Sequence, residues 1–371
     1  MQFTVKQEDM WKGMQAVLSI VPAKSALPIL SNAVFENSED IISISATDLD
    51  VSLSTRIPAQ TIREGAIILP AKKIADVLRE LPSTPLEFSL ENEQMTISSS
   101  YGTYKILGFK KDEYPEVPQK VEGTDIGIEG PSLQRMIEKT IFAVSIDETR
   151  PALNGVLWQI KRDEMRMVAT DGHRLAKLVN TVPRNQTVEK EIIIPTKALS
   201  CLSRFRSEMG ELKRVTLGQN HILFDLGSTR IYSRLIAETY PNYERVIPTT
   251  NDKKLIVNKE ALSASVKRVS VLSNAITHQI RLSLKGDGIV LSALDREIGG
   301  EAKEEIAADF SNDPMDIGYN AQYLLEILSH IESEDVIFEL STPTTAGLVY
   351  PIRQKEHEEY VCLIMPLRLK D

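Results

Sequence analysis

The chain repeats one pattern three times at a spacing of about 125 residues. The clearest copy is ILPAKKIADVLREL at 68–81, which returns as IIPTKALSCLSRF at 193–205 and, more faintly, as IGYNAQYLLEILSHI at 317–331. A second shared segment precedes each copy, and it contains an aspartate that we call the anchor aspartate: Asp48, Asp171 and Asp295. Solenoid units usually span about 20–50 residues, so a repeat this long indicates a duplicated domain. We therefore expect three similar domains in tandem.

A third of the 371 residues is enough for a domain with its own core. Polar, proline-bearing joints lie near 114–126 and 241–254. We accordingly place the domains at 1–120, 121–248 and 249–371.

Apolar residues recur at three- and four-residue spacing in two stretches of each copy, which predicts two helices per domain. The predicted helices cover 6–22, 70–81, 131–146, 195–206, 258–272 and 319–332. Short β-branched runs such as IISISA, GVLWQI and GIVLSAL predict strands, about eight per domain, and KGDG at 285–288 predicts a hairpin turn. The expected fold class is α+β, with two helices packed on antiparallel sheets in each domain.

The composition is that of an ordinary globular protein, 42% hydrophobic and 26% charged. No apolar run approaches the roughly 20 residues of a membrane helix, and the N-terminus has no export signal, so we expect a cytoplasmic protein without membrane contact. Cys201 and Cys362 belong to different copies and are expected to be reduced thiols. No motif for a metal, a cofactor or a phosphate-binding loop is present, so neither a metal nor a cofactor is expected.

The charge distribution leaves two interpretations open. The chain carries a net charge of −9, yet the six predicted helices together are net positive. Their lysines and arginines could be ordinary solvated side chains, or they could form a shared surface for a polyanion. Lys72 and Lys197 follow the proline of the repeated segment in two copies, which favours the second interpretation.

Two irregular segments stand out against the repeat. The middle copy has TDGHRLA at 170–176 where the first has TDLDVSL, and the chain ends in an apolar strand followed by MPLRL at 365–369. His173 has no accompanying nucleophile or metal-binding motif, so a binding corner is favoured over a hydrolase site. A methionine-proline-leucine tail offers adaptable apolar surface for peptides.

Five ordered motifs identify a family. LPIL, RPALNG, ATDGHRLA, YPNYERVIP and MPLRL, spread over the full length, resemble the bacterial sliding clamp, the beta subunit of DNA polymerase III. The resemblance implies three DNA-clamp domains per chain and a head-to-tail homodimeric ring around duplex DNA, near the nucleoid. It implies a non-catalytic processivity factor that docks the replicative polymerase alpha subunit, the clamp loader, and repair and mismatch-repair proteins through short linear peptides.

The resemblance also assigns residues. It implies a peptide-binding cleft, with arginines at its rim, formed by Leu153, Thr170, Gly172, His173, Arg174, Leu175, Pro241, Arg245, Val246, Leu363, Met365, Pro366, Leu367, Arg368 and Leu369. It implies DNA contacts, independent of base sequence, from Lys24, Lys72, Arg150 and Lys197. Pro151 and Ala152 stand where the family sometimes has aromatic residues, which disfavours base stacking there. The implied dimer interface includes Tyr104, Ile106, Val271 and Leu272.

Two alternatives remain at this point: a scaffold that binds peptides but not DNA, and a hydrolase that uses the His173 corner. Lys370 and Asp371 extend past the family's common ending, and we expect them to be tolerated.

Overall fold

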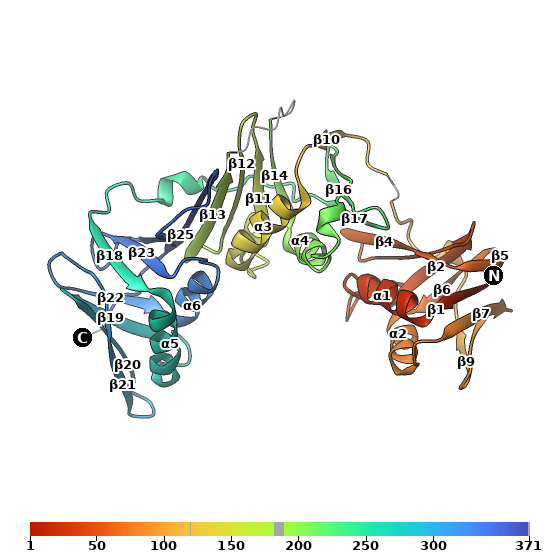
Figure 1. The fold of residues 1–371 in the computed structure, drawn as a ribbon, viewed down its shortest axis with the longest axis horizontal. Helices are drawn as coiled ribbons and strands as arrows, with labels where there is room; N and C mark the ends of the chain where they lie inside the picture. Colours follow the sequence, from red (N-terminus) through yellow and green to blue (C-terminus); the bar gives the residue numbers. More distant parts are fainter. Residues whose placement is uncertain (119, 182–188, 370–371) are drawn as a thin grey trace. The chain divides into compact units, whose positions relative to one another are not determined.

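The structure is a computed structural model that describes residues 1–118, 120–181 and 189–369 (Figure 1). Lys370 and Asp371 therefore lie outside the described residues. Within the described ranges the chain forms six α-helices, as predicted: α1 Gln7–Leu18, α2 Ala71–Glu80, α3 Gly130–Thr140, α4 Thr196–Ser203, α5 Lys259–Val269 and α6 Ala321–Ser329.

The helices are shorter than the apolar periodicity suggested. α1 ends at Leu18, four residues before Pro22, because the amide of Ser19 donates to the carbonyls of Ala16 and Val17 and tightens the last turn. The predicted stretches 131–146 and 258–272 continue beyond α3 and α5 as short 3-10 turns, Ile141–Ala143 and Ser270–Leu272. α5 and α6 begin where asparagines accept backbone hydrogen bonds: Asn258 from Ala261, and Asn320 from Gln322 and Tyr323.

Among the described residues, the three copies contain nine, eight and eight β-strands, close to the predicted eight per domain. The first copy contains β1 Gln2–Lys6, β2 Asn32–Ser38, β3 Ile41–Thr47, β4 Val51–Pro58, β5 Gln60–Arg63, β6 Gly65–Pro70, β7 Pro85–Glu91, β8 Gln94–Ser99 and β9 Gly102–Leu107. The second contains β10 Thr124–Ile126, β11 Gly155–Ile160, β12 Met165–Thr170, β13 Arg174–Asn180, β14 Lys190–Pro195, β15 Arg214–Leu217, β16 His221–Asp225 and β17 Thr229–Arg234. The third contains β18 Lys253–Asn258, β19 Gln279–Lys285, β20 Gly288–Asp295, β21 Gly300–Ala307, β22 Met315–Asn320, β23 Asp335–Leu340, β24 Gly347–Pro351 and β25 Glu358–Ile364.

The chain folds into two compact units that divide the second copy between them. Unit 1 comprises 1–134 and 197–235, and contains a five-stranded sheet, β5-β1-β7-β8-β9, and an eight-stranded sheet, β10-β15-β16-β17-β4-β3-β2-β6. The antiparallel pairing of β4 with β17 joins strands of the first and second copies. α1 packs closely on this sheet, since a Cβ added at Gly13 would lie 2.3 Å from Cδ1 of Ile57.

Unit 2 comprises 135–196 and 236–371. It contains an eight-stranded sheet, β14-β11-β12-β13-β25-β24-β23-β18, and a four-stranded sheet, β21-β20-β19-β22. Here the antiparallel pairing of β13 with β25 joins the second and third copies, with Arg174 opposite Ile364 and Asn180 opposite Glu358. The hairpin between β19 and β20 turns at Lys285–Gly288 as predicted, with Gly286 at a φ of 47°.

The cores are apolar and the two cysteines lie within them as free thiols. Burial raises the pKa of Cys201 to about 11 and that of Cys362 to about 12, so both stay protonated near neutral pH. No helix in the described part of the chain is long and apolar enough to cross a membrane.

Candidate functional site

Asp48 and Asp171 build the same local turn, and Asp295 caps a longer turn through one amide. Oδ1 of Asp48 accepts the amides of Asp50 and Val51, and Oδ1 of Asp171 accepts those of His173 and Arg174. Oδ1 of Asp295 accepts the amide of Glu297 at 2.9 Å. An aspartate that caps its own turn in this way presents its second oxygen, Oδ2, to other partners. The repeat seen in the sequence is thus a repeated corner in the structure.

The threonine before the anchor aspartate closes the corner. Thr170 Oγ1 donates to the carbonyl of Arg174 at 2.6 Å and accepts the amide of Gly172 at 3.1 Å. Gly172 has a φ of 89°, and a Cβ there would lie 3.1 Å from Nη1 of Arg150. The middle corner therefore uses glycine where a side chain would be strained and would press on Arg150.

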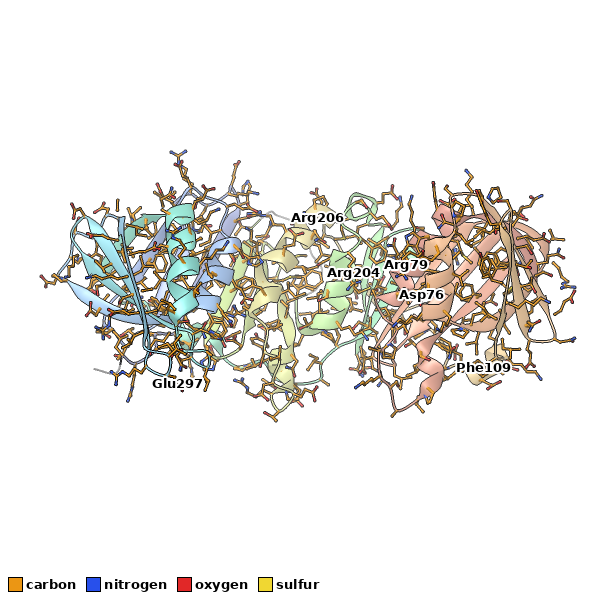
Figure 2. The ribbon with its side chains drawn as sticks, turned by 90° about the horizontal axis from the view of Figure 1, so that it is seen from below. Asp76, Arg79, Phe109, Arg204, Arg206 and Glu297 are labelled. Atoms are coloured by element: carbon orange, nitrogen blue, oxygen red, sulfur yellow. The ribbon has the colours of Figure 1, made fainter. Side chains whose placement is uncertain are left out.

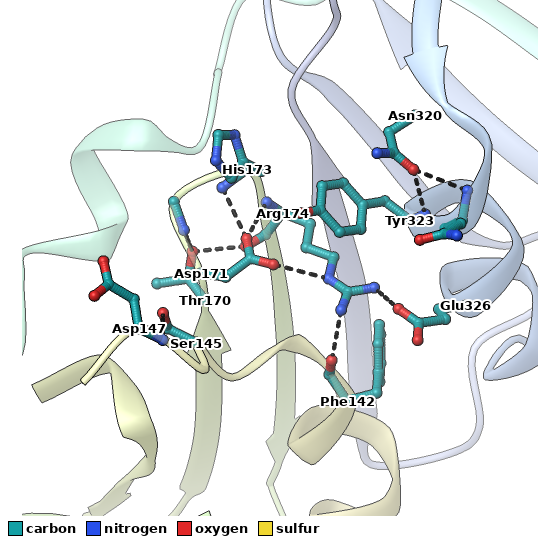
Figure 3. Close-up of polar contacts among 12 residues, drawn as sticks. Phe142, Ser145, Asp147, Thr170, Asp171, His173, Arg174, Asn320, Tyr323 and Glu326 are labelled. Atoms are coloured by element: carbon teal, nitrogen blue, oxygen red, sulfur yellow. Dashed lines mark hydrogen bonds and ion pairs between the residues drawn. The ribbon is translucent and has the colours of Figure 1, made fainter. Parts of the chain in front are cut away.

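Arg174 lies beneath this corner instead of at a solvent-exposed rim (Figure 3). Its side chain is 8% exposed; Nε donates to Asp171 Oδ2 at 3.2 Å and Nη2 to the carbonyl of Phe142 at 2.8 Å. Nη1 bonds Glu326 of α6.

The expectation of a rim position is therefore wrong for Arg174. The guanidinium also lies 4.5 Å from the centre of the Tyr323 ring, an arrangement in which the positive charge faces the π-electrons. The carboxylates and the ring hold the guanidinium inward. Arg245 and Arg368, by contrast, are exposed.

His173 is exposed, and its ring stacks near that of Tyr323 at a centroid distance of 6.0 Å (Figure 3). Within the described ranges no three His, Cys, Asp or Glu side chains are placed to hold a metal ion. The geometry of the corner is that of a packed surface loop.

The tail runs back to the same corner. The pairing of β13 with β25 sets Leu175 opposite Leu363, and the amide of Met365 then donates to the carbonyl of His173 at 2.8 Å. Further along, the amide of Leu367 donates to the carbonyl of Gly318 at 2.8 Å. The two irregular segments of the sequence therefore lie side by side, and the tail is fixed through its backbone.

We call the combined surface of 170–175, 241–246 and 363–369 the corner–tail surface. Beneath it lies a buried apolar cluster: Leu157, Val168, Leu175, Ile193, Tyr243, Ala346, Leu348 and Leu363. At the surface, Val246 is 55% and Met365 40% exposed, whereas Leu153 is buried. Pro241 is exposed, and Pro366, Leu367 and Leu369 are half-buried. This is an apolar floor with soft apolar residues open to solvent above it.

A pocket of about 530 Å³ lies elsewhere in unit 2. Its lining is Lys253, Lys285, Asp313, Pro314, Met315, Asp316, Ser341, Thr342 and Pro343, and it includes no residue of the corner–tail surface. Its rim is largely charged and polar, so it suits an apolar peptide side chain less well than the corner–tail surface does.

The predicted DNA-contacting residues differ in how much of their charge is available. Lys24 and Lys72 are exposed, and no ion pair is described for either within the ranges given above. Arg150 is held by Asp147 at 2.9 Å and by the carbonyl of Asp171 at 3.1 Å, with 44% of its side chain exposed. Lys197 bonds Asp48 Oδ2 and the carbonyl of Ile20.

Other helix cations are also neutralised in part. Arg79 pairs with Asp76 at 3.3 Å, and Arg268 pairs with Glu304 at 2.6 Å. Arg204 and Arg206, just after the end of α4, are exposed (Figure 2). The net positive charge counted along the helices therefore overstates the charge available to a polyanion.

The predicted interface residues sit at strand edges or on exposed turns. Tyr104 and Ile106 are half-buried on β9, an edge strand, and Val271 is 76% exposed beside half-buried Leu272. Leu107 and Ile298, which were not among the predicted residues, are 67% and 69% exposed and lie on or next to edge strands. Sequence reasoning missed Tyr323 and Glu326, because their role depends on a contact with Arg174 that no local pattern encodes.

Comparison with known proteins gives a consistent result along the whole chain. The family model of the DNA polymerase III beta subunit matches as its N-terminal domain over residues 1–118, its central domain over 127–242 and its C-terminal domain over 244–368. The beta sliding clamp of Pseudomonas putida is 30% identical over 371 residues, covering 100% of both chains. That of Bacillus subtilis is 30% identical over 381 residues, covering 99% of this chain and 100% of the relative.

Solved structures agree. The sliding clamp of Bartonella birtlesii, bound to griselimycin, superposes with a TM-score of 0.93 at 31% identity and full coverage of both chains. The clamp of Bacillus subtilis does so with a TM-score of 0.90 at 27% identity, again over both full chains. With three clamp domains in order and relatives matched over their whole length, this chain belongs to the DNA polymerase III beta subunit family, the bacterial beta sliding clamps.

Proposed function

We propose that two copies of this chain close head to tail into a ring around duplex DNA and that each copy docks partner proteins at its corner–tail surface. Family membership supplies the general function, that of a non-catalytic processivity factor of DNA polymerase III. The proposal concerns how this chain carries out that function and with which residues. We keep the domain limits at 1–120, 121–248 and 249–371, and a cytoplasmic location at the nucleoid, as parts of it.

The observation that carries the docking site is the junction of corner and tail. An apolar floor lies under exposed Val246 and Met365, and the backbone of the tail is already bonded to His173 and Gly318. A peptide would therefore meet a surface that is fixed before binding, which lowers the entropic cost of association. Polymerase, clamp loader and repair proteins would each insert a short linear peptide there.

Two substitutions on exposed side chains test the docking site without disturbing the core. Val246→Asp and Met365→Asp should weaken binding of a polymerase-derived peptide by about tenfold or more, because a carboxylate would be desolvated against apolar groups. Ile352→Asp is the matched control, since Ile352 is 41% exposed and outside the corner–tail surface. Peptide titration by fluorescence anisotropy gives the affinities. Equal affinity of the wild type and the three variants would refute the site. Removal of residues 365–371 should abolish peptide binding and leave the dimer intact.

DNA contact is proposed for Lys24, Lys72, Arg150 and Lys197, with binding to phosphates and no base readout. Lys24 and Lys72 are the best supported candidates of the four, because no acidic partner is described for them within residues 1–118, 120–181 and 189–369. Such contacts are weak and salt-sensitive, so the ring would hold DNA through its topology and still slide.

Retention on DNA of different topology tests the ring itself. Loaded with clamp loader and ATP, the protein should stay on nicked circular DNA and be lost soon after the circle is linearised. Gel filtration of labelled protein with each DNA measures this. Equal loss from both forms would contradict encirclement. If the protein binds peptide but is never loaded onto DNA, and Lys24→Glu leaves its behaviour with DNA unchanged, a scaffold that binds peptides but not DNA is the better description.

The dimer interface is proposed at Tyr104, Ile106, Val271 and Leu272. Support comes from exposed Val271 and from the edge position of β9, which among the described residues pairs with β8 alone. A hydrolase at the His173 corner is not retained, because the family is non-catalytic.

A further inference from the structure

The tail leaves one sheet of unit 2 and comes to lie on the edge of the other. β25 is an inner strand of the eight-stranded sheet and ends at Ile364. The amide of Leu367 then donates to the carbonyl of Gly318 at 2.8 Å, and the two residues form an isolated antiparallel bridge. Gly318 belongs to β22, an edge strand of the four-stranded sheet. An edge strand offers backbone groups for such pairing, and the tail uses one of them.

Gly318 leaves the space that the tail occupies. A Cβ at this position would lie 2.7 Å from the carbonyl oxygen of Leu367 and 2.8 Å from Cδ2 of Leu369. The leucine side chain could turn aside, whereas the carbonyl oxygen belongs to the backbone and could retreat only if the tail moved away from β22. Gly318 does not have a positive φ, so its backbone conformation would accept another residue. The need for glycine at this position therefore comes from the tail.

A side chain of the neighbouring strand holds the next residue of the tail. Nε2 of Gln279, the first residue of β19, donates to the carbonyl of Arg368 at 3.1 Å. Gln279 lies opposite Asn320 in the pairing of β19 with β22, two residues along from Gly318. Gly318 and Gln279 thus contact consecutive residues of the tail, and both do so through the backbone of the tail.

This arrangement leaves the side chain of Met365 available to a partner. The amide of Met365 donates to the carbonyl of His173, while the side chain is 40% exposed. The tail is held at Met365 and again at Leu367 and Arg368, so the segment between these points is fixed at both ends. A peptide would meet Met365 already in place, which lowers the entropic cost of binding.

Resting on the proposed docking site, we propose that Gly318 and Gln279 are positioning residues for peptide binding, because they hold the tail on the edge of β22 and so keep Met365 at the corner–tail surface. Neither residue belongs to the corner–tail surface itself. Their effect on a bound peptide is exerted through the tail. A tail released from β22 would displace Met365 and leave the rest of the surface unchanged.

Hydrogen exchange followed by mass spectrometry on the full-length protein measures how firmly the tail is held. Gly318→Ala should speed exchange of the amides of residues 365 and 367–369 about tenfold, because the added methyl group would displace the carbonyl of Leu367. Gln279→Met keeps the length of the side chain without a donor and should speed exchange about threefold, the effect of one lost hydrogen bond. Gln279→Lys restores a donor and should return the rate to that of the wild type.

Peptide affinity, measured by fluorescence anisotropy, shows whether the position of the tail matters for docking. Gly318→Ala should lower the affinity about tenfold, because Met365 would no longer lie where the peptide meets it. Gly288→Ala is the matched control in the same sheet. The nearest atom to a Cβ at Gly288 would be the carbonyl oxygen of Ile306 at 3.3 Å, which is not part of the tail. This control should change neither the exchange of the tail nor the affinity, and thermal unfolding shows that each variant is folded.

The outcomes separate the holding of the tail from the docking site. Wild-type exchange in both Gly318→Ala and Gln279→Met would overturn the holding of the tail, and faster exchange with wild-type affinity in Gly318→Ala would overturn its role in docking. Val246→Asp should lose affinity while the exchange of its tail stays that of the wild type. A wild-type protein that binds no peptide would instead overturn the docking site, and the positioning role with it.

Discussion

Gly172 and Leu49 occupy the same position of two corners and have nearly the same backbone conformation, with φ of 89° and 84°. Leucine in this region is strained, whereas glycine is not. The first copy tolerates the strain with Leu49 half in solvent, 49% exposed. In the middle copy a Cβ at position 172 would also lie 3.1 Å from Nη1 of Arg150, which would have to move aside. Single residues thus explain why the middle corner differs from its equivalents.

Gly172→Ala should lower the free energy of unfolding by about 1–2 kcal/mol, the cost of a side chain in the left-handed region. It should also weaken peptide binding, since the corner would have to shift away from Arg150. Denaturant unfolding and peptide titration measure the two effects. Gly210→Ala is the control, because Gly210 has no atom within 4 Å of an added Cβ. If both variants unfold alike, the strain assigned to Gly172 is absent.

At the scale of elements, α3 is bound to the third copy by a network of charges within unit 2. Glu332 pairs with Arg135 at 2.7 Å, with Lys139 at 3.0 Å and with Lys355 at 3.1 Å. Burial acts to raise the pKa of Glu332, but hydrogen bonds from these three cations outweigh it and lower the pKa to about 2. Lys139 is only 6% exposed, so it depends on this carboxylate.

Glu332→Gln should lower the free energy of unfolding at pH 7 by roughly 1 kcal/mol, because buried Lys139 would lose its carboxylate, while solvent screens part of the interaction at half-exposed Glu332. A carboxyl with a lowered pKa in the folded state stabilises the protein fully above its unfolded pKa of 4.5 and loses that contribution as pH falls toward 2. The difference between wild type and variant should therefore shrink below pH 4.5. Urea unfolding at pH 7, 5 and 3 checks this, and a constant difference would contradict the assignment.

At the scale of the whole molecule, neighbouring copies are joined by two strand pairings, β4 with β17 and β13 with β25. In the proposed ring, a second copy would extend the sheets at the edges that β9 and β21 leave open. The retention experiment on circular and linear DNA belongs to this scale, since only a closed ring distinguishes the two forms.

The sequence by itself determined the triplication, the six helices and the α+β class, because apolar periodicity and repeated turn residues are local signals. It also determined the family, through motifs that stay recognisable along the chain. The sequence predicted the ends of the helices less well. The end of α1 at Leu18 depends on which carbonyls the amide of Ser19 reaches, and the apolar pattern does not specify this.

Only the tertiary structure decided which charged side chains are free to bind a partner and which are held in ion pairs within the chain. Lys197 is engaged by Asp48 across 149 positions of sequence, and Arg174 by Glu326 across 152. Such ion pairs arise from packing between distant segments, and no local pattern of residues specifies them.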